Sequence, residues 1–336
     1  MLEKPDLADD KIIACVLDEY GLQAVHFEFL PLGADQNTAV YRLVTFNQAA
    51  YFVKLRRGSF EELSVILPEF FHSQGIMQII APLPTTTRQL WADLEDFKVI
   101  LYPFVEGHNG YEARLLDDHW ITFGKTLKSI HTIRVPTAIL ERIQIETYPP
   151  QARMTVRRLL KNVYDDSVND PIVNELITFL HLKCSEILDL VRRAEKLARK
   201  LQSSSSELII CHSDLHAGNL LVDADDDLYI VDWDNPILAP KERDLMFVGG
   251  GQFGAGRTPQ QEEALFYQGY GPTQIDPIAM AYYRYERIVQ DIAADCEQIL
   301  MKNEGGDDRE QSLQYLKSNF LPNNTIEIAY QSDQTI

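Results

Sequence analysis

The sequence predicts an α+β protein, with strands concentrated in its first third and helices in the remainder. Residues 27–55 and 97–102 contain short apolar runs of strand length. From residue 117 onward, apolar residues recur at helical spacing over several long segments. A chain of 336 residues that is 45% hydrophobic can bury a large core and is long enough for two domains.

The first third alternates between helix and strand patterns. A helical face over residues 11–20 ends at Gly21, and a strand pattern follows from Phe27. The segment 32–38 interrupts this pattern, which resumes over 39–46; a plain hairpin loop and a loop over a nucleotide are both open interpretations, because the segment has no G-x-G-x-x-G or Walker pattern.

The next strand, residues 51–55, contains a single lysine, Lys54. A lysine at such a position usually extends its charge to solvent. A helix is expected over 60–73, where Pro68 either kinks the helix or starts a second one. Residues 97–105 begin as a buried strand and then meet Pro103, which is typical of a strand that ends in a turn or a hinge.

The remaining segments are mainly helical. A helix over 117–131 is expected to start with Asp117 as its N-terminal cap. Further helices are predicted over 154–164, 171–202, 260–270, 278–301 and 312–320.

Residues 208–234 carry the groups that best indicate chemistry. Three short apolar strands, 208–211, 220–222 and 228–231, are separated by loops. Asp214 lies in the first loop, Asn219 follows five residues later, and Asp232 ends the last strand. Two carboxylates and an amide at these intervals suit phosphoryl transfer, which needs metal ligands and a group that orients the attacking hydroxyl. The acidic run 223–227 is interpreted as a turn.

The runs CHSDLHAGN (211–219) and IVDWD (230–234) resemble the aminoglycoside phosphotransferase family of small-molecule kinases, which shares the protein-kinase-like fold. The resemblance implies a bilobal protein. Residues 1–104 would form a small nucleotide-binding lobe with a β-sheet and a helix, and 105–336 a larger, mostly helical catalytic and substrate-binding lobe.

The resemblance also implies roles for individual residues. Asp214 would be the catalytic base, while Asn219 and Asp232 would bind Mg²⁺. Lys54 would contact the phosphates of ATP and pair with a glutamate of the following helix; Glu62 is preferred over Glu61 and Glu69. Backbone groups of Pro103, Phe104 and Val105 would bind adenine, and Asp244 would brace the catalytic loop. GTP stays open as an alternative to ATP.

Two runs narrow the resemblance within the family. LAPKERDLMF (238–247) and YRYERIV (283–289) resemble the type that phosphorylates spectinomycin, an aminocyclitol antibiotic. This implies a cationic small-molecule substrate and antibiotic resistance. The helix over 278–301 could be ordinary core with a polar face, or it could line a pocket for a cationic ligand. Carboxylates pair with ammonium groups, so the candidate substrate-binding residues are Asp234, Glu286 and Asp291.

Composition limits the other partners. The net charge of −19 argues against nucleic-acid binding, and no apolar run approaches the roughly eighteen residues that a membrane helix needs. The first ten residues lack the features of a secretory signal. We therefore expect a cytoplasmic protein with no membrane partner. A monomer is expected as well, although the sequence itself says nothing about oligomeric state. The four cysteines contain no C-x-x-C pair, which argues against a zinc site or a disulfide framework.

Three alternative functions share some of these features. A kinase for choline, homoserine or a sugar would share every core residue, because only the helical part of the protein contacts the acceptor. A protein kinase is disfavoured by Ser213, by Trp233-Asp234 in place of Phe-Gly, and by the lack of an Ala-Pro-Glu run. A non-catalytic nucleotide- or drug-binding protein is disfavoured by the presence together of Lys54, Asp214, Asn219 and Asp232.

Overall fold

The computed structural model describes residues 3–33, 35, 37–162, 170–250, 253, 256–301, 306–322 and 324–334. The chain divides into two compact units. Unit 1 comprises Met1–Leu115, Val135–Arg142 and Gly218–Pro236, and unit 2 comprises Leu116–Arg134, Ile143–Ala217 and Ile237–Ile336. Unit 1 thus takes in two later segments, and the lobe boundary predicted between residues 104 and 105 stays a prediction.

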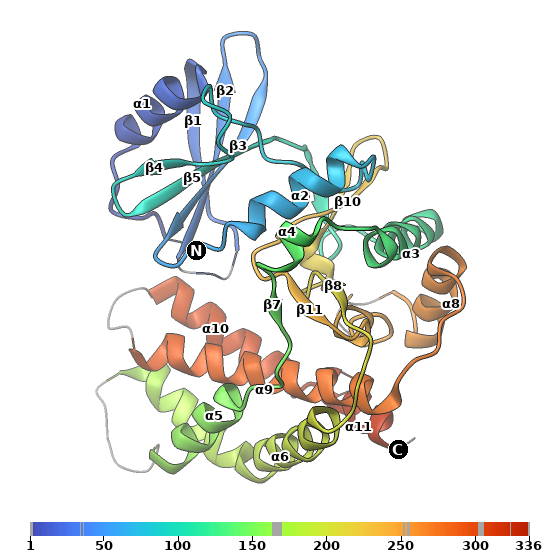
Figure 1. The fold of residues 1–336 in the computed structure, drawn as a ribbon. Helices are drawn as coiled ribbons and strands as arrows, with labels where there is room; N and C mark the ends of the chain where they lie inside the picture. Colours follow the sequence, from blue (N-terminus) through green and yellow to red (C-terminus); the bar gives the residue numbers. More distant parts are fainter. Residues whose placement is uncertain are drawn as a thin grey trace. The chain divides into compact units, whose positions relative to one another are not determined.

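Unit 1 is built on a five-stranded antiparallel sheet in the order β1-β2-β3-β5-β4 (Figure 1). Its strands are β1 (Ala24–Leu30), β2 (Thr38–Thr45), β3 (Ala50–Arg57), β4 (Ala92–Leu94) and β5 (Phe97–Pro103). Helix α1 (Asp9–Tyr20) packs against this sheet and ends at Gly21, whose φ of 68° suits glycine. Ile12 and Val16 of α1 are fully buried with Leu43, Val53 and other strand residues, which makes one core.

Three further parts complete unit 1. Helix α2 (Leu63–Ser73) follows β3 and contains Pro68 in its interior, so the proline does not start a second helix. A second antiparallel sheet has the order β10-β9-β6 and is formed by β6 (Gly107–Asn109), β9 (Leu220–Asp223) and β10 (Leu228–Ile230). Asp223 turns the chain between β9 and β10, because its carboxylate accepts the N–H groups of Asp225 and Asp227. The short helix α4 (Thr137–Leu140) belongs to the same unit.

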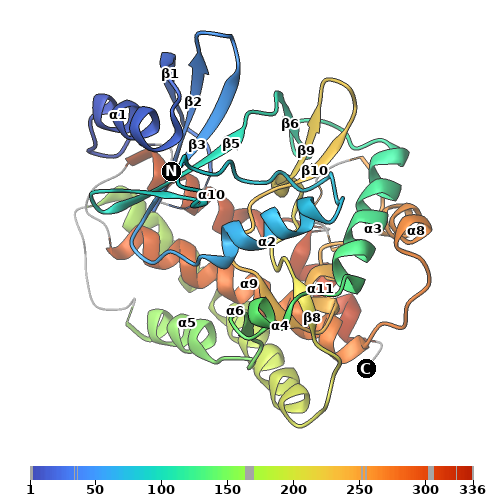
Figure 2. The ribbon, with the colours of Figure 1, turned by 45° about the horizontal axis from the view of Figure 1, so that its top comes forward.

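Unit 2 is mainly helical and is organised around α9 (Pro277–Met301). Helices α5, α6, α10 and α11 pack against α9, as Figures 1 and 2 both show. Their bounds are α5 (Gln151–Asn162), α6 (Pro171–Gln202), α10 (Gly306–Ser318) and α11 (Thr325–Asp333). The predicted bounds of α6 are exact, because Asp170 caps it and Pro171 occupies its first turn. The preceding helix was predicted to end at Tyr164, a position that lies outside the described residues.

Helices α3 (Asp117–Thr132) and α8 (Pro259–Tyr270) lie side by side in unit 2 (Figure 2). They approach closely because each offers a glycine: a Cβ on Gly124 would lie 2.1 Å from the carbonyl oxygen of Phe266, and one on Gly269 would lie 1.9 Å from that of Ile121. The N-terminal cap of α3 is Leu116 rather than the expected Asp117, which lies in the first turn. The expected cap was therefore wrong by one residue.

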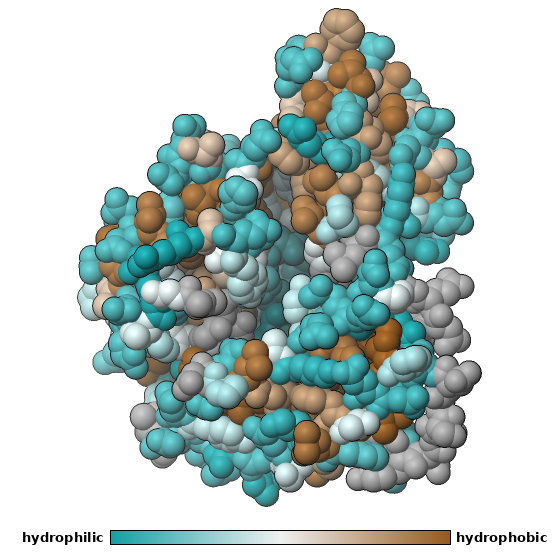
Figure 3. Space-filling view, turned by 180° about the vertical axis from the view of Figure 1, so that it is seen from behind, coloured by the Kyte–Doolittle hydropathy of each residue, from teal (hydrophilic) through white to brown (hydrophobic). Residues whose placement is uncertain are grey.

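A small sheet, β7-β11-β8, and the short helix α7 hold the catalytic-loop region of unit 2. These elements are β7 (Gln144–Ile145), β8 (Ile209–Cys211), β11 (Ile237–Ala239) and α7 (Glu242–Leu245). The α+β class predicted from the sequence is confirmed. None of the helices in the described ranges has an apolar stretch of the length that a membrane span requires. Figure 3 shows one face, on which hydrophobic residues are scattered among hydrophilic ones.

Candidate active site

In unit 1, the ammonium group of Lys54 lies between two carboxylates from the end of β10. Lys54 Nζ donates hydrogen bonds to Asp232 Oδ1 at 2.8 Å and to Asp234 Oδ1 at 2.6 Å. The lysine side chain is 10% exposed, so these charges interact in a partly desolvated site. Strand β3 places Lys54 between Val40 of β2 and Ile100 of β5. The lysine is therefore held on the central strand of the sheet, and its charge does not extend to solvent.

The charges of this cluster control one another. Burial alone would lower the pKa of Lys54, but the adjacent carboxylates of Asp232 and Asp234 outweigh it and raise that pKa above its usual value. The lysine therefore stays positive. Burial also raises the pKa of the Asp234 carboxyl, against the opposing effect of Lys54.

Arg56 is a second cation in this cluster that the sequence reasoning missed. Its Nη1 lies 2.7 Å from Thr38 Oγ1 and 3.4 Å from Asp234 Oδ2, and it also contacts the carboxylate of Asp35. The alternation of side chains along a strand could have indicated Arg56, since residues two positions apart on β3, such as Lys54 and Arg56, share a face of the sheet.

The β9–β10 hairpin brings Asn219 and Asp232 to the same end of a sheet. Ile230 pairs with Leu220, and the N–H of Val231 donates to the carbonyl of Asn219 at 3.0 Å. Asp232 adopts a φ of 66°, a left-handed conformation that is uncommon for residues other than glycine and is often found at functional sites.

These residues fit a magnesium ion. Amide and carboxylate oxygens are the hard ligands that Mg²⁺ prefers. The Asp232 side chain is 47% exposed, and one of its oxygens accepts a hydrogen bond from the Lys54 ammonium. This carboxylate therefore already has one positive group beside it, as a metal-binding carboxylate would. The metal-binding roles of Asn219 and Asp232 stay predictions.

The expected pairing of Lys54 with Glu62 was wrong. Glu62 forms an ion pair with Arg142. Among the described residues, Lys54 instead pairs with Asp232 and Asp234. Glu62 precedes α2 as its cap residue, with a side chain that is 47% exposed, so it is directed to another partner. Its role in binding the cofactor stays a prediction.

The predicted adenine-binding backbone follows β5. Pro103 ends the strand opposite Tyr51, and the N–H of Phe104 donates to the carbonyl of Ala50 at 3.1 Å. The N–H of Phe104 is therefore already used inside the sheet. Within the described part of the chain, the N–H of Val105 has no such acceptor, which makes it the better of the two donors for a base.

In unit 2, Asp244 holds the backbone of the catalytic loop, as expected. Its carboxylate, which is fully buried, accepts the N–H of His212 at 2.9 Å and that of Ser213 at 2.7 Å. His131 Nε2 lies 3.0 Å from the same carboxylate, and His131 Nδ1 lies 2.8 Å from the hydroxyl of Tyr270. Asp244 thus fixes a loop in which Ser213 has a φ of 73°.

Asp214 follows this fixed backbone, and its carboxylate contacts Arg287 of α9. His216 Nε2 lies 3.7 Å from the same oxygen. Arg287 Nε is also 2.9 Å from Asp291 Oδ1, one turn later on α9. Burial lowers the pKa of Arg287, but Asp291 and Asp214 outweigh it and raise that pKa, so the guanidinium stays charged.

The three predicted substrate-binding carboxylates lie in different surroundings. Glu286 is 2% exposed, with an oxygen 3.2 Å from Arg153 Nε, and burial raises its pKa to about 7. Asp234 is held by Lys54 in unit 1, and Asp291 is held by Arg287 in unit 2. All three contact cationic side chains of this chain, and their roles in substrate binding stay predictions.

Comparison with known proteins shows which family and which solved structures this chain is similar to. The model of the phosphotransferase enzyme family matches residues 28–278. A spectinomycin phosphotransferase crystallised with ADP and spectinomycin has a TM-score of 0.90 and 36% identity, covering 98% of this chain and 100% of that one. The AMP-bound complex of spectinomycin phosphotransferase has a TM-score of 0.85 and 36% identity, covering 96% of this chain and 98% of that one.

A more distant structure supports the fold alone. An amicoumacin kinase bound to AMP-PNP and Ca²⁺ has a TM-score of 0.61 at 15% identity, covering 98% of both chains. The kinase-like fold and the family resemblance seen in the sequence are confirmed. The chain belongs to the phosphotransferase enzyme family.

Proposed function

We propose that this protein transfers the γ-phosphoryl group of ATP to a hydroxyl of spectinomycin or a similar cationic aminocyclitol, and so confers resistance to it. The observation that carries the proposal is the 36% identity, over essentially the full length of both chains, to a phosphotransferase crystallised with that antibiotic. A cytoplasmic location, where ATP is made, and a monomeric state belong to the proposal.

The mechanism assigns one step to each group. Lys54 and Arg56 bind phosphate oxygens, which brings positive charge to a protein whose net charge is −19. Asn219 and Asp232 would bind Mg²⁺, which neutralises charge on the phosphates when bound. The acceptor oxygen forms a bond to the γ-phosphorus, and the bond from that phosphorus to the β,γ-bridging oxygen breaks. ADP leaves, and the hydroxyl proton passes to Asp214.

The experiment that tests the proposed substrate is a panel of acceptors with ATP and Mg²⁺. Spectinomycin, kanamycin, choline and homoserine are compared by ADP release and by mass spectrometry of the product. We expect phosphorylated product with spectinomycin at a kcat/KM at least about tenfold above the others, a difference of about 1.4 kcal/mol in transition-state binding. Preferential phosphorylation of choline or homoserine would overturn the assignment of the acceptor.

A further inference from the structure

Arg287 connects the proposed catalytic base to α9. Its guanidinium contacts Asp214 through Nη1, while its Nε faces Asp291 at 2.9 Å. The carbon at the centre of the guanidinium lies 5.6 Å from the centre of the Phe247 ring, which is within cation–π distance. The side chain is 21% exposed. Arg287 is thus held from two sides before it reaches Asp214.

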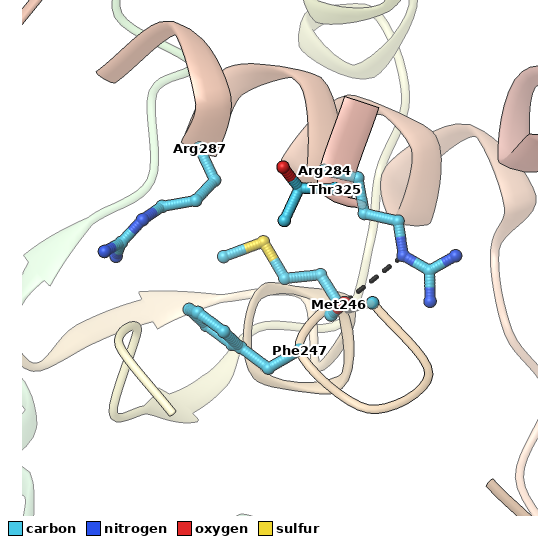
Figure 4. Close-up of a pocket in the computed structure, with 6 residues that line it drawn as sticks. Met246, Phe247, Arg284, Arg287 and Thr325 are labelled. Carbon is cyan, nitrogen blue, oxygen red and sulfur yellow. Dashed lines mark hydrogen bonds between the residues drawn. The ribbon is translucent and has the colours of Figure 1, made fainter. Parts of the chain in front are cut away.

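The neighbouring arginine of α9 has a different task. Figure 4 shows Arg284 and Arg287 extending from the same helix in opposite directions, with Met246 and Phe247 below them. Arg284 Nε donates to the carbonyl of Met246 at 3.2 Å, and its other nitrogens contact the Val248 carbonyl and Ser332. These contacts hold backbone and a helix, and none of them involves Asp214.

The loop that carries Asp214 does not depend on Arg287 for its backbone conformation. Asp244 already accepts the N–H groups of His212 and Ser213, immediately before Asp214. Arg287 instead contacts the carboxylate itself. A guanidinium is a planar donor with fixed directions, so a bond to one carboxylate oxygen restricts the rotation of the whole group. The direction from which the carboxylate accepts a proton is then set by Arg287.

We propose that Arg287 is a positioning residue, which orients the Asp214 carboxylate toward the acceptor hydroxyl, and that Asp291 holds Arg287 in place. The inference rests on the proposed function, because it needs Asp214 to be the base. It also gives Asp291 a role different from binding the ammonium group of the substrate. Loss of this orientation lowers the rate of the chemical step, because proton transfer needs the base and the hydroxyl at hydrogen-bond distance and in the right direction.

The test compares Arg287→Ala, Asp291→Asn and the matched control Arg284→Ala in steady-state kinetics with spectinomycin and ATP. We expect R287A to lower kcat by about 10-fold to 100-fold, less than the roughly 100-fold to 10,000-fold that general acid–base catalysis typically contributes, because the base itself stays in place, while KM for ATP changes less than about twofold. D291N should lower kcat in the same direction and leave the acceptor KM nearly unchanged. R284A should lower the melting temperature and leave kcat nearly unchanged.

A chemical rescue separates positioning from structural support. Guanidinium chloride, added below denaturing concentration, should raise the turnover of R287A several-fold and leave the wild type and R284A unchanged. Turnover of R287A within about twofold of the wild type would overturn the inference. An increase in the acceptor KM of D291N without loss of kcat would assign Asp291 to the substrate and would also overturn it. If R287A does not melt cooperatively, Arg287→Gln decides by the same criterion.

The proposed function and this inference fail in distinguishable ways. If the wild type makes no phosphorylated acceptor, or if Asp214→Ala keeps its turnover, the proposed function fails. If the wild type is active, Asp214→Ala is inactive and R287A behaves as the wild type, only the inference about Arg287 fails.

Discussion

At the scale of single residues, the ion pairs around Lys54 show what spacing in the sequence can and cannot specify. The intervals between Asp214, Asn219 and Asp232 indicated phosphoryl transfer directly. The partner of Lys54 could not be predicted from spacing, because Lys54 and Asp232 are separated by 178 positions and only the folded chain brings them together. The same holds for Arg287 and Asp214, which are 73 positions apart.

Replacing Lys54 by methionine tests the phosphate site. The substitution removes the charge of a side chain that is 10% exposed and keeps most of its volume. We expect ATP affinity, measured by calorimetry, to fall by about 10-fold to 100-fold, or about 1.4 to 2.8 kcal/mol.

Lys98→Met is the matched control for Lys54→Met. Lys98 lies on the neighbouring strand β5 and pairs with the exposed Asp93. The Lys98→Met variant should bind ATP with the affinity of the wild type. Unchanged affinity in the Lys54 variant would contradict the assigned role of this lysine.

At the scale of elements, the long helices were predictable and the short elements were not. The sequence specifies α6 through its cap Asp170, Pro171 in its first turn, and an apolar face continued over 32 residues. Strands β7 and β11 have two and three residues, and they exist because β11 pairs with β7 on one side and with β8 on the other. No periodicity can be read from so few residues.

The contact between α8 and the loop after α7 predicts a dependence of stability on pH. Glu262 of α8 is 4% exposed and accepts the N–H of Gly249 at 3.2 Å. Burial raises its pKa from 4.5 to about 7. Because the folded state prefers the neutral carboxyl, this group costs no stability below about pH 4.5, and stability is lost as the pH rises toward 7.

Glu262→Gln should remove that dependence. Urea unfolding at about pH 5 and about pH 8 should show the variant gaining about 2 kcal/mol on the wild type between the two values, since one pKa unit equals about 1.4 kcal/mol. Glu327→Gln, an exposed position in the first turn of α11, is the control and should show no such gain. A constant difference between wild type and E262Q would contradict the raised pKa.

At the scale of the whole molecule, an acidic protein has to bind an acidic nucleotide. The net charge is −19, yet Lys54 and Arg56 place two cations on one face of the sheet of unit 1. The overall charge bears on classes of partner such as nucleic acid, and it says nothing about such a local site. The family, and with it the reaction type, could be inferred from the sequence, because a few motifs specify the reaction. The acceptor could be inferred only by resemblance.

Thermal melting in the presence of ADP tests the metal site in the intact protein. A ligand at about 100 times its Kd stabilises the folded state by about 2.7 kcal/mol, so ADP with Mg²⁺ should raise the melting temperature by a few degrees. Removal of the metal with EDTA should abolish most of this increase. Asn219→Ala and Asp232→Ala should lose the increase due to Mg²⁺, whereas Asp225→Ala, in the turn after β9, should keep it. Loss of the increase in the Asp225 variant alone would contradict the assignment.

The most direct test of the central claim is phosphoryl transfer from ATP to spectinomycin by the wild type and by Asp214→Ala, followed by mass spectrometry of the antibiotic. We expect one added phosphoryl group per spectinomycin with the wild type. We expect turnover at least about 100-fold lower with Asp214→Ala, which should still bind ADP. Near-normal turnover in that variant, or spectinomycin left unmodified by the wild type, would contradict that claim.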